Sequence, residues 1–288
     1  MFVTEEAAIT LRQAGAEATA LLVASGLSAT ARRDAELLLM HVTGLDRAQL
    51  LTRPEYRLSA DDTDHYRRLV ARRAASEPLQ YITGAQEFFG LRFKVTPDVL
   101  IPRPETEHLV EAVLTRVAKD GPARIVDVGS GSGAIAVALA HSLPRAELTA
   151  LDISPAALKA ARQNAENNGV ADRIRFVESN LFSAIAGERF DIIVSNPPYI
   201  AESDRLTLEA QVRDYEPHRA LFAGPTGLEI YQRLIPQAAA LLMPGGWLML
   251  EIGAGQKSSL QQLLESWSNV DFLPDLQGIP RVAVAQLP

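Results

Sequence analysis

The chain has 288 residues, of which 47% are hydrophobic and 22% are charged, and its formal net charge is −7. Its length predicts about two domains, and its composition is typical of a globular protein with a sizeable core. The absence of cysteine excludes disulfides and thiolate catalysis, and with five scattered histidines we expect no metal site. The acidic balance provides no overall attraction for nucleic acid. Because we find neither an 18-residue apolar run nor a basic leader, we expect a cytoplasmic protein with no membrane partner.

Residues 1–75 are predicted to form a small helical domain. Thr4 is the expected cap of a first helix, and apolar residues follow at helical spacing as far as Leu22. Thr30 and Gly44 are expected to bound a second helix, and Ser59 is expected to cap a third. We interpret this domain as a substrate-recognition module. Its arginine cluster is interpreted as a solvated helix face, with a docking surface as the alternative: Arg67, Arg68, Arg72 and Arg73.

Residues 76–106 are predicted to link two domains through a β-hairpin. Gly90 separates two apolar runs, which is a hairpin signal. A stiff segment, Pro102-Arg103-Pro104, then leads into a helix, and Pro104 suits its first turn.

Residues 107–288 are predicted to form an α/β domain. Strands are expected at Ile125–Val128, Glu147–Asp152, Ile174–Val177, Asp191–Ser195 and Gly246–Ile252. Helices fill the gaps between them, so these five strands should be parallel. The last two strands, Val270–Leu273 and Arg281–Val284, are too close in sequence for a crossover helix, so they should pair antiparallel. The result is a Rossmann-like sheet of seven strands with a terminal antiparallel hairpin.

A glycine-rich turn follows the first strand of this domain and indicates a cofactor site. Its residues are Gly129, Ser130, Gly131, Ser132 and Gly133. Glycines allow a tight turn and close approach of a ligand, and the next helix offers free N–H groups. Asp152 ends the second strand, where its carboxylate can accept both hydroxyls of a ribose. Asn180 and Leu181 follow the third strand, where an adenine would lie. The glycine pattern also fits nicotinamide dinucleotides, so a nicotinamide oxidoreductase stays open.

The fourth strand runs into Asn196-Pro197-Pro198-Tyr199, which we interpret as the catalytic and substrate-binding loop. The two prolines stiffen the backbone. Asn196 offers an amide oxygen, Pro197 a free carbonyl and Tyr199 a flat ring. Two acceptors and a ring suit a planar NH2 group.

These motifs together resemble the class I S-adenosylmethionine-dependent methyltransferases that modify planar NH2 groups. Further stretches are similar to the peptide chain release factor glutamine methyltransferases: Pro78-Leu79-Gln80-Tyr81-Ile82-Thr83-Gly84, Leu100-Ile101-Pro102-Arg103-Pro104-Glu105-Thr106-Glu107, Tyr215-Glu216-Pro217, and Glu251-Ile252-Gly253 with Gln256. The resemblance implies methylation of the glutamine amide nitrogen in the Gly-Gly-Gln motif of class 1 release factors. It implies S-adenosyl-L-methionine as cofactor, S-adenosyl-L-homocysteine as product, no metal and no nucleic-acid requirement, and we expect a monomer.

Carried over by position, Gly129 to Gly133, Asp152, Leu181 and Asn196 would bind the cofactor, and Asn196 to Tyr199 would hold the glutamine. Many members of the family have Asp where this chain has Asn180. Asn keeps an acceptor and adds donors, so adenine binding should survive with altered affinity. Besides the nicotinamide oxidoreductase, three alternatives stay open: a glutamine methyltransferase of a large-subunit ribosomal protein, an N-methyltransferase of a nucleic-acid base, and a silent cofactor-binding module.

Overall fold

The structure is a computed structural model that describes residues 9–288. The chain divides into two units. The described residues of the first unit are 9–84 and 210–215, and the second unit holds residues 85–209 and 216–288. The predicted cap Thr4 lies outside the described residues.

The first unit is helical, as predicted. Its helices are α1 (Leu11–Ala24), α2 (Ala31–Thr43), α3 (Arg47–Thr52), α4 (Ala60–Ala74), α5 (Leu79–Thr83) and α9 (Ala210–Arg213). The side chain of Ser59 caps α4, as predicted. Helix α1 is capped by the side chain of Thr10, which the sequence analysis did not predict. Gly44 ends α2 with a left-handed backbone. The helices enclose an apolar core whose fully buried members include Leu22, Leu38 and Tyr66.

One of the four clustered arginines is buried, so the interpretation of the cluster as a solvated face is wrong for Arg73. The Arg73 side chain is 4% exposed, and its Nε lies 2.8 Å from Oδ2 of Asp34 on α2. Arg73 also donates to the carbonyl of Glu77. A buried charge requires such partners, and this ion pair fastens α4 to α2 inside the first unit.

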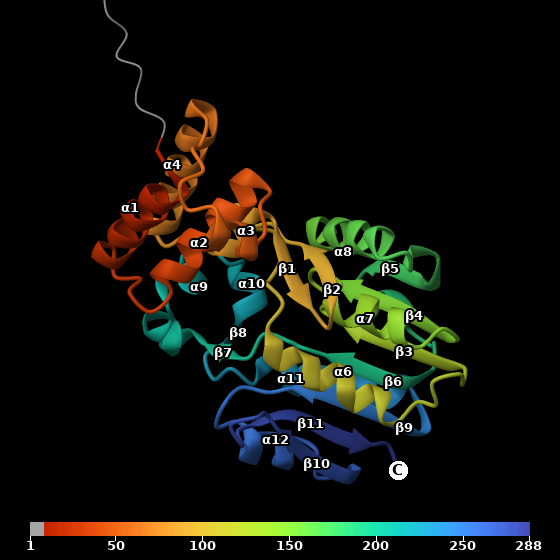
Figure 1. Cartoon of the computed structure of the whole chain (residues 1–288). Coiled ribbons are helices and arrows are strands. Elements are labelled where there is room, and N and C mark those ends of the chain that lie inside the picture. The colour runs from red at the N-terminus through yellow and green to blue at the C-terminus, as the bar shows by residue number, and fades with distance from the viewer. Residues whose placement is uncertain (1–8) are drawn as a thin grey trace, which may run out of the picture. The chain divides into compact units, whose positions relative to one another are not determined.

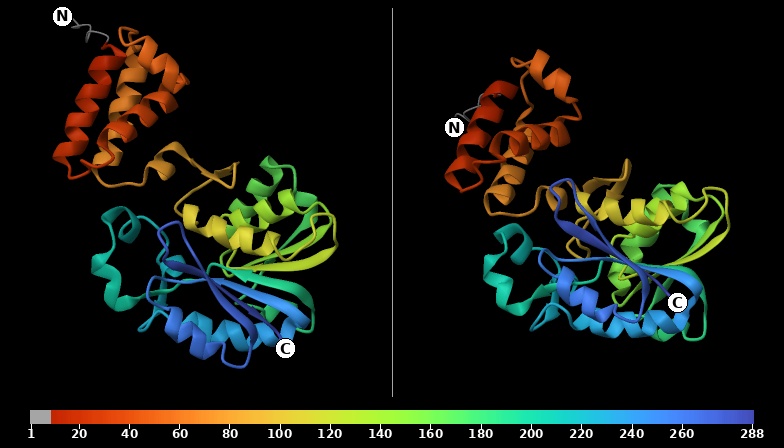
Figure 2. Two further views of the ribbon diagram at one scale, coloured as in Figure 1. Left: turned by 60° about the horizontal axis from the view of Figure 1, so that its bottom comes forward. Right: turned by 90° about the horizontal axis from the view of Figure 1, so that it is seen from below.

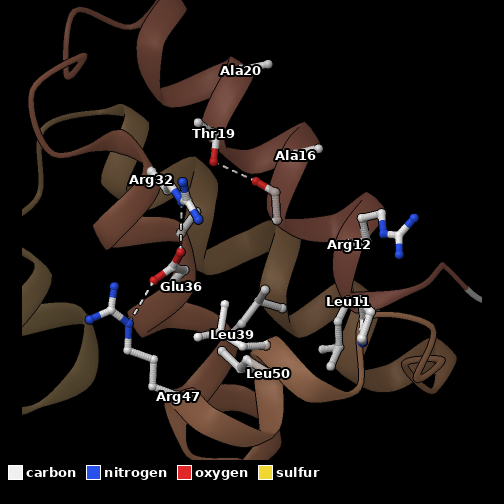
Figure 3. Close-up of a pocket in the computed structure, with 14 residues that line it drawn as sticks. Leu11, Arg12, Ala16, Thr19, Ala20, Arg32, Glu36, Leu39, Arg47 and Leu50 are labelled. Atoms are coloured by element: carbon white, nitrogen blue, oxygen red, sulfur yellow. Dashed lines mark hydrogen bonds and ion pairs between the residues drawn. The ribbon is translucent and has the colours of Figure 1, made fainter.

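Helices α1, α2 and α3 line an open groove of about 550 Å³ in the first unit (Figure 3). Its floor is apolar and includes Leu11, Leu39 and Leu50. Figure 3 shows Glu36 between Arg32 and Arg47 at one side of the groove, where both arginines form ion pairs with it.

The second unit is built on a seven-stranded sheet, as predicted (Figure 1). Its order is β10-β11-β9-β6-β3-β4-β5. The strands are β3 (Ala123–Val128), β4 (Ala146–Asp152), β5 (Ile174–Glu178), β6 (Phe190–Ser195), β9 (Leu242–Glu251), β10 (Ser268–Pro274) and β11 (Pro280–Gln286). Five strands are parallel, and β11 is antiparallel to both β9 and β10.

Helices cover both faces of this sheet (Figure 2). One face packs against α6 (Glu107–Leu114), α7 (Ala134–Ser142) and α8 (Pro155–Asn167). The other packs against α11 (Glu229–Leu241) and α12 (Lys257–Leu263). Burial on two faces explains why β3 and β6 hold consecutive buried apolar residues, such as Ile125-Val126 and Ile192-Ile193-Val194, in place of strict alternation. Short helical segments complete the unit: η1 (Pro104–Thr106), η2 (Ala171–Arg173), η3 (Ser183–Ile185), η4 (Glu202–Thr207) and α10 (His218–Leu221).

The predicted β-hairpin is present as β1 (Ala85–Phe88) and β2 (Leu91–Lys94). Phe89 and Gly90 form its turn, with φ of 53° and 70°. The buried amide of Asn164 on α8 accepts from the Lys94 N–H and donates to the carbonyls of Lys94 and Ser132. The hairpin is thereby tied to the glycine-rich turn. A further short pair joins β7 (Ile200–Ala201) to β8 (Phe222–Gly224). Among the described residues, no helix is both long enough and apolar enough to cross a membrane.

Candidate functional site

A cavity of about 730 Å³ lies at the carboxyl ends of β3, β4, β5 and β6. Open parallel sheets bind ligands at this edge, and the volume is within the range of small-molecule sites. Most of the predicted site residues line it: Gly129, Gly131, Asp152, Asn180, Leu181, Asn196, Pro197 and Pro198. Ser130, Ser132, Gly133 and Tyr199 are not among its lining residues.

The glycines of the turn after β3 have two different roles. Gly129 and Gly131 have φ of 75° and 54°, and a Cβ on either would meet no atom within 4 Å. They leave open space on the cavity side for a ligand. Gly133 packs against α8 instead, because a Cβ there would lie 2.9 Å from the Cβ of Ala161.

The serines of this turn are buried and support its backbone. The Ser130 hydroxyl donates to Oδ2 of Asp127 at 2.7 Å, and the Ser132 carbonyl accepts from Asn164. Asp127 is fully buried, and this burial raises its pKa to about 7. Its Oδ1 has no hydrogen-bond partner among the described residues. Asp127 carried no signal in the sequence, although only Val128 separates it from the glycine-rich turn.

Asp152 faces the cavity at the end of β4. Its Oδ2 accepts from the Gly131 N–H and its Oδ1 accepts from the Ser154 N–H, both at 2.8 Å. Burial raises the pKa of this carboxyl, while the backbone donors and Arg219 oppose that rise. Each oxygen keeps a lone pair for a ligand hydroxyl, so the pair of ribose hydroxyls fits this carboxylate.

Asn180 and Leu181 border the cavity after β5. Leu181 has a left-handed backbone with φ of 52°, a strained conformation that often marks ligand sites. Asn180 is exposed, and its Oδ1 accepts from Nη2 of Arg233 on α11 at 2.9 Å. Its acceptor is therefore already engaged by a cation, which the sequence did not predict.

Asn196 lies directly after β6. The preceding Ser195 is fully buried, and its hydroxyl donates to the Val128 carbonyl at 2.6 Å. Asn196 donates from Nδ2 to the Thr106 hydroxyl at 3.1 Å. It has no other side-chain hydrogen bond among the described residues. Its Oδ1 is thus a free acceptor on a residue that lines the cavity.

Tyr199 anchors the far end of the Asn-Pro-Pro-Tyr loop. Its hydroxyl donates to Oε1 of Glu251 at 3.4 Å. Its carbonyl accepts from Nε2 of Gln256, which also donates to the carbonyl of Gly227. Gln256 in turn accepts from the Gly253 N–H, so one side chain joins three backbone segments.

Glu251 is 2% exposed at the end of β9. Burial raises its pKa to about 7, while the Thr106 and Tyr199 hydroxyls oppose that rise. Thr106, Glu251 and Gln256 belong to stretches that resemble the family, but the sequence assigned none of them a role in the site. Their spacing carried no signal of a shared site, because the hydrogen bond from Asn196 to Thr106 spans 90 positions.

The arrangement can hold a nucleoside-bearing ligand along the ends of four strands, with an amide acceptor at one end of the cavity. In the described residues, no cluster of three His, Cys, Asp or Glu side chains is placed to hold a metal ion.

Two family models match the chain, and they cover much of its length. Residues 13–84 match the PrmC N-terminal domain, and residues 105–212 match the methyltransferase small domain.

Two solved structures show the same fold. The chain is 17% identical to the hMettl16 catalytic domain in complex with a 3′UTR hairpin, with a TM-score of 0.56, over 85% of this chain and 94% of that one. It is 22% identical to a T. thermophilus 16S rRNA methyltransferase in complex with AdoMet and guanosine, with a TM-score of 0.53, over 71% of this chain and 50% of that one.

Curated relatives are much more similar. The release factor glutamine methyltransferase of Koribacter versatilis is 47% identical, over 97% of this chain and 99% of its own. That of Moorella thermoacetica is 46% identical, over 96% of this chain and 98% of its own. Such identity over nearly the whole of each chain means that this chain belongs to the release factor glutamine methyltransferase family.

Proposed function

We propose that this chain transfers a methyl group from S-adenosyl-L-methionine to the side-chain amide nitrogen of the glutamine in the Gly-Gly-Gln motif of class 1 peptide chain release factors. The observation that carries the proposal is the free Oδ1 of Asn196 at the cavity. Family membership supports the choice of substrate.

The residues of the cavity fit this cofactor. Gly129 and Gly131 leave open backbone for a ligand, Asp152 offers acceptors for ribose hydroxyls, and Leu181 offers an apolar edge for an adenine. When bound, S-adenosylmethionine supplies an electrophilic methyl group on a sulfonium.

The loop at Asn196 acts on the substrate amide. An amide nitrogen is a poor nucleophile because its lone pair is delocalised into the carbonyl. The Oδ1 of Asn196 and the carbonyl of Pro197 each accept a hydrogen bond from one of the two N–H groups of the amide. These bonds keep electron density on the nitrogen and orient it toward the methyl group. These acceptors are already in place when positive charge develops on nitrogen. The nitrogen would gain the methyl group as S-adenosyl-L-homocysteine leaves, and it would then release one of its two hydrogens as a proton to water. No general base of matched pKa is required by this scheme.

Three finer points belong to the same proposal. The enzyme works without a metal ion, because positioned acceptors are sufficient for this reaction. It acts as a monomer, and it acts in the cytoplasm, where its release-factor substrate takes part in translation.

Transfer of labelled methyl to three acceptors tests the proposal: a release factor, a ribosomal extract and mixed DNA. We expect label on the release factor, and none on a variant whose Gly-Gly-Gln glutamine is replaced by alanine. Label in the extract alone would move the substrate to a ribosomal protein, and label on DNA alone would move it to a base. Bound cofactor with no label anywhere would indicate a silent module.

Asn180→Asp is expected to tighten cofactor binding about two- to fivefold. One carboxylate oxygen would pair with Arg233, and the other would accept from the adenine amino group. The new hydrogen bond from the adenine amino group contributes about 0.5–1 kcal/mol. Calorimetry of S-adenosylmethionine binding measures the change. Weaker binding by Asn180→Asp would contradict this role.

A further inference from the structure

We propose that Thr106 is a positioning residue: by receiving the amide hydrogen of Asn196, it makes Asn196 present its oxygen to the substrate. The inference rests on the proposed function and assigns a role to the stiff segment before α6.

Asn196 and Thr106 form a hydrogen-bonded pair between the cavity and the interior. Asn196 Nδ2 donates to Oγ1 of Thr106 at 3.1 Å. Thr106 is 4% exposed, so it has no ready access to bulk water. Among the described residues, Asn196 has no other side-chain hydrogen bond that competes with this one.

The donor and acceptor atoms of Asn196 give the orientation of its amide. A side-chain amide donates only from its NH2 group, and its oxygen can only accept. Because Nδ2 donates to Thr106, the NH2 group faces inward, and Oδ1 is left without a partner among the described residues. Asn196 lines the cavity, so this oxygen is the acceptor that the loop side chain offers there.

The opposite rotamer would be unproductive. It would present the Asn196 NH2 group to the NH2 group of the substrate, and neither group has an acceptor to offer. It would also place Oδ1 against the Thr106 oxygen. A small change of orientation would thus remove one of the two acceptors on which the reaction depends.

The backbone around Thr106 is held firmly. Pro104 begins the helical turn η1, and Arg103 beside it forms an ion pair with Glu216. Glu216 is 3% exposed and also accepts from the Ile101 N–H. Glu216 therefore holds the start of the segment from Ile101 to Thr106, and the bond to Asn196 holds its end. A rigid segment of this kind can keep a functional side chain in place.

The test compares Thr106→Val with Thr106→Ser. Valine keeps the shape and removes the hydroxyl, whereas serine keeps the hydroxyl. We expect kcat to fall about tenfold in Thr106→Val. Loss of a hydrogen-bond partner that orients a metal-ligating side chain has an effect of about this size in other enzymes. Thr106→Ser should stay within about threefold of wild type, and the Kd for S-adenosylmethionine should be unchanged in both.

Thr149→Val is the matched control, because Thr149 is also buried in the second unit but does not line the cavity. It should keep the wild-type kcat. A kcat of Thr106→Val within twofold of wild type, or a serine variant as slow as the valine variant, would overturn the proposal.

A separate readout does not depend on the substrate. The side-chain ¹⁵N amide signal of Asn196, assigned by its loss in Asn196→Asp, should shift in Thr106→Val and stay in place in Thr149→Val. If wild type methylates no release factor, the proposed function fails, yet this signal still decides whether Thr106 holds the amide. An unshifted signal in Thr106→Val would refute the role.

Discussion

Asn196→Ala is expected to lower kcat for glutamine methylation by about 10²–10³, with the Kd for S-adenosylmethionine changed little. The reason is that Oδ1 of Asn196 is the side-chain acceptor of the loop, and it acts on the nitrogen where charge develops. Single preorganised groups of this kind contribute about 10²–10³ in rate in other enzymes. Single-turnover transfer of labelled methyl measures the change, and calorimetry measures cofactor binding.

Two further variants separate chemistry from structure. Asn167→Ala removes an exposed asparagine from α8, and it should leave the rate unchanged. Asn196→Asp keeps an acceptor oxygen but loses the donor to Thr106 and adds a charge near Glu251, so its rate should lie between those of alanine and wild type. A near-normal single-turnover rate for Asn196→Ala, with normal cofactor binding, would contradict the proposed mechanism.

The sheet was predictable because its strands obey local rules. Apart from Asp127, the run Ile125–Val128 is apolar and β-branched, and it lies within β3 at the centre of the sheet. The short spacing between the last two strands left antiparallel pairing as the only arrangement, and β10 and β11 pair in that way. Strand β9 begins at Leu242, earlier than the predicted start at Gly246. Its first residues include Pro244 and glycines that are typical of a turn, so the sequence did not reveal this part of the strand.

Short elements escaped prediction for a different reason. Helix α3 has six residues, too few for a helical period to emerge, although Asp46 and Gln49 form a capping box that could have revealed it. Strands β7 and β8 are two and three residues long and pair across an intervening segment of the chain. Nothing local to either one marks it as a strand.

The support of the candidate site depends on distant contacts. The sequence placed Asp152 and Asn196 at strand ends, where a parallel sheet brings such residues to one edge. It could not pair Asn196 with Thr106 or Tyr199 with Glu251, because those contacts span 90 and 52 positions. The same limit hid the burial of Arg73, whose partner Asp34 is 39 positions away.

Gly227→Ala is expected to lower kcat by about 10²-fold and to destabilise the protein by about 3 kcal/mol. Gly227 has φ of 78°, and a Cβ there would lie 2.5 Å from the carbonyl oxygen of Tyr199. A left-handed alanine costs about 1–2 kcal/mol, and overpacking adds about 1–3. The obstructing atom belongs to the backbone of the catalytic loop, so relief of the clash must move that loop. A displacement of about 1 Å at a reacting group can cost about 10² in rate.

Gly278→Ala separates the effect of the left-handed backbone from the effect of the steric clash. Gly278 has φ of 82°, but there is open space where its Cβ would be. It should lose only about 1–2 kcal/mol, the cost of the left-handed backbone, and it should keep its kcat. Urea denaturation gives the stabilities, and single-turnover methyl transfer gives the rates. If both variants lose equal stability and Gly227→Ala keeps full activity, then contact between Gly227 and Tyr199 does not position the loop. A rate loss confined to Gly227→Ala would instead mean that activity depends on the position of the Tyr199 carbonyl. That carbonyl lies next to Gly227 and accepts from Gln256, which also donates to the carbonyl of Gly227.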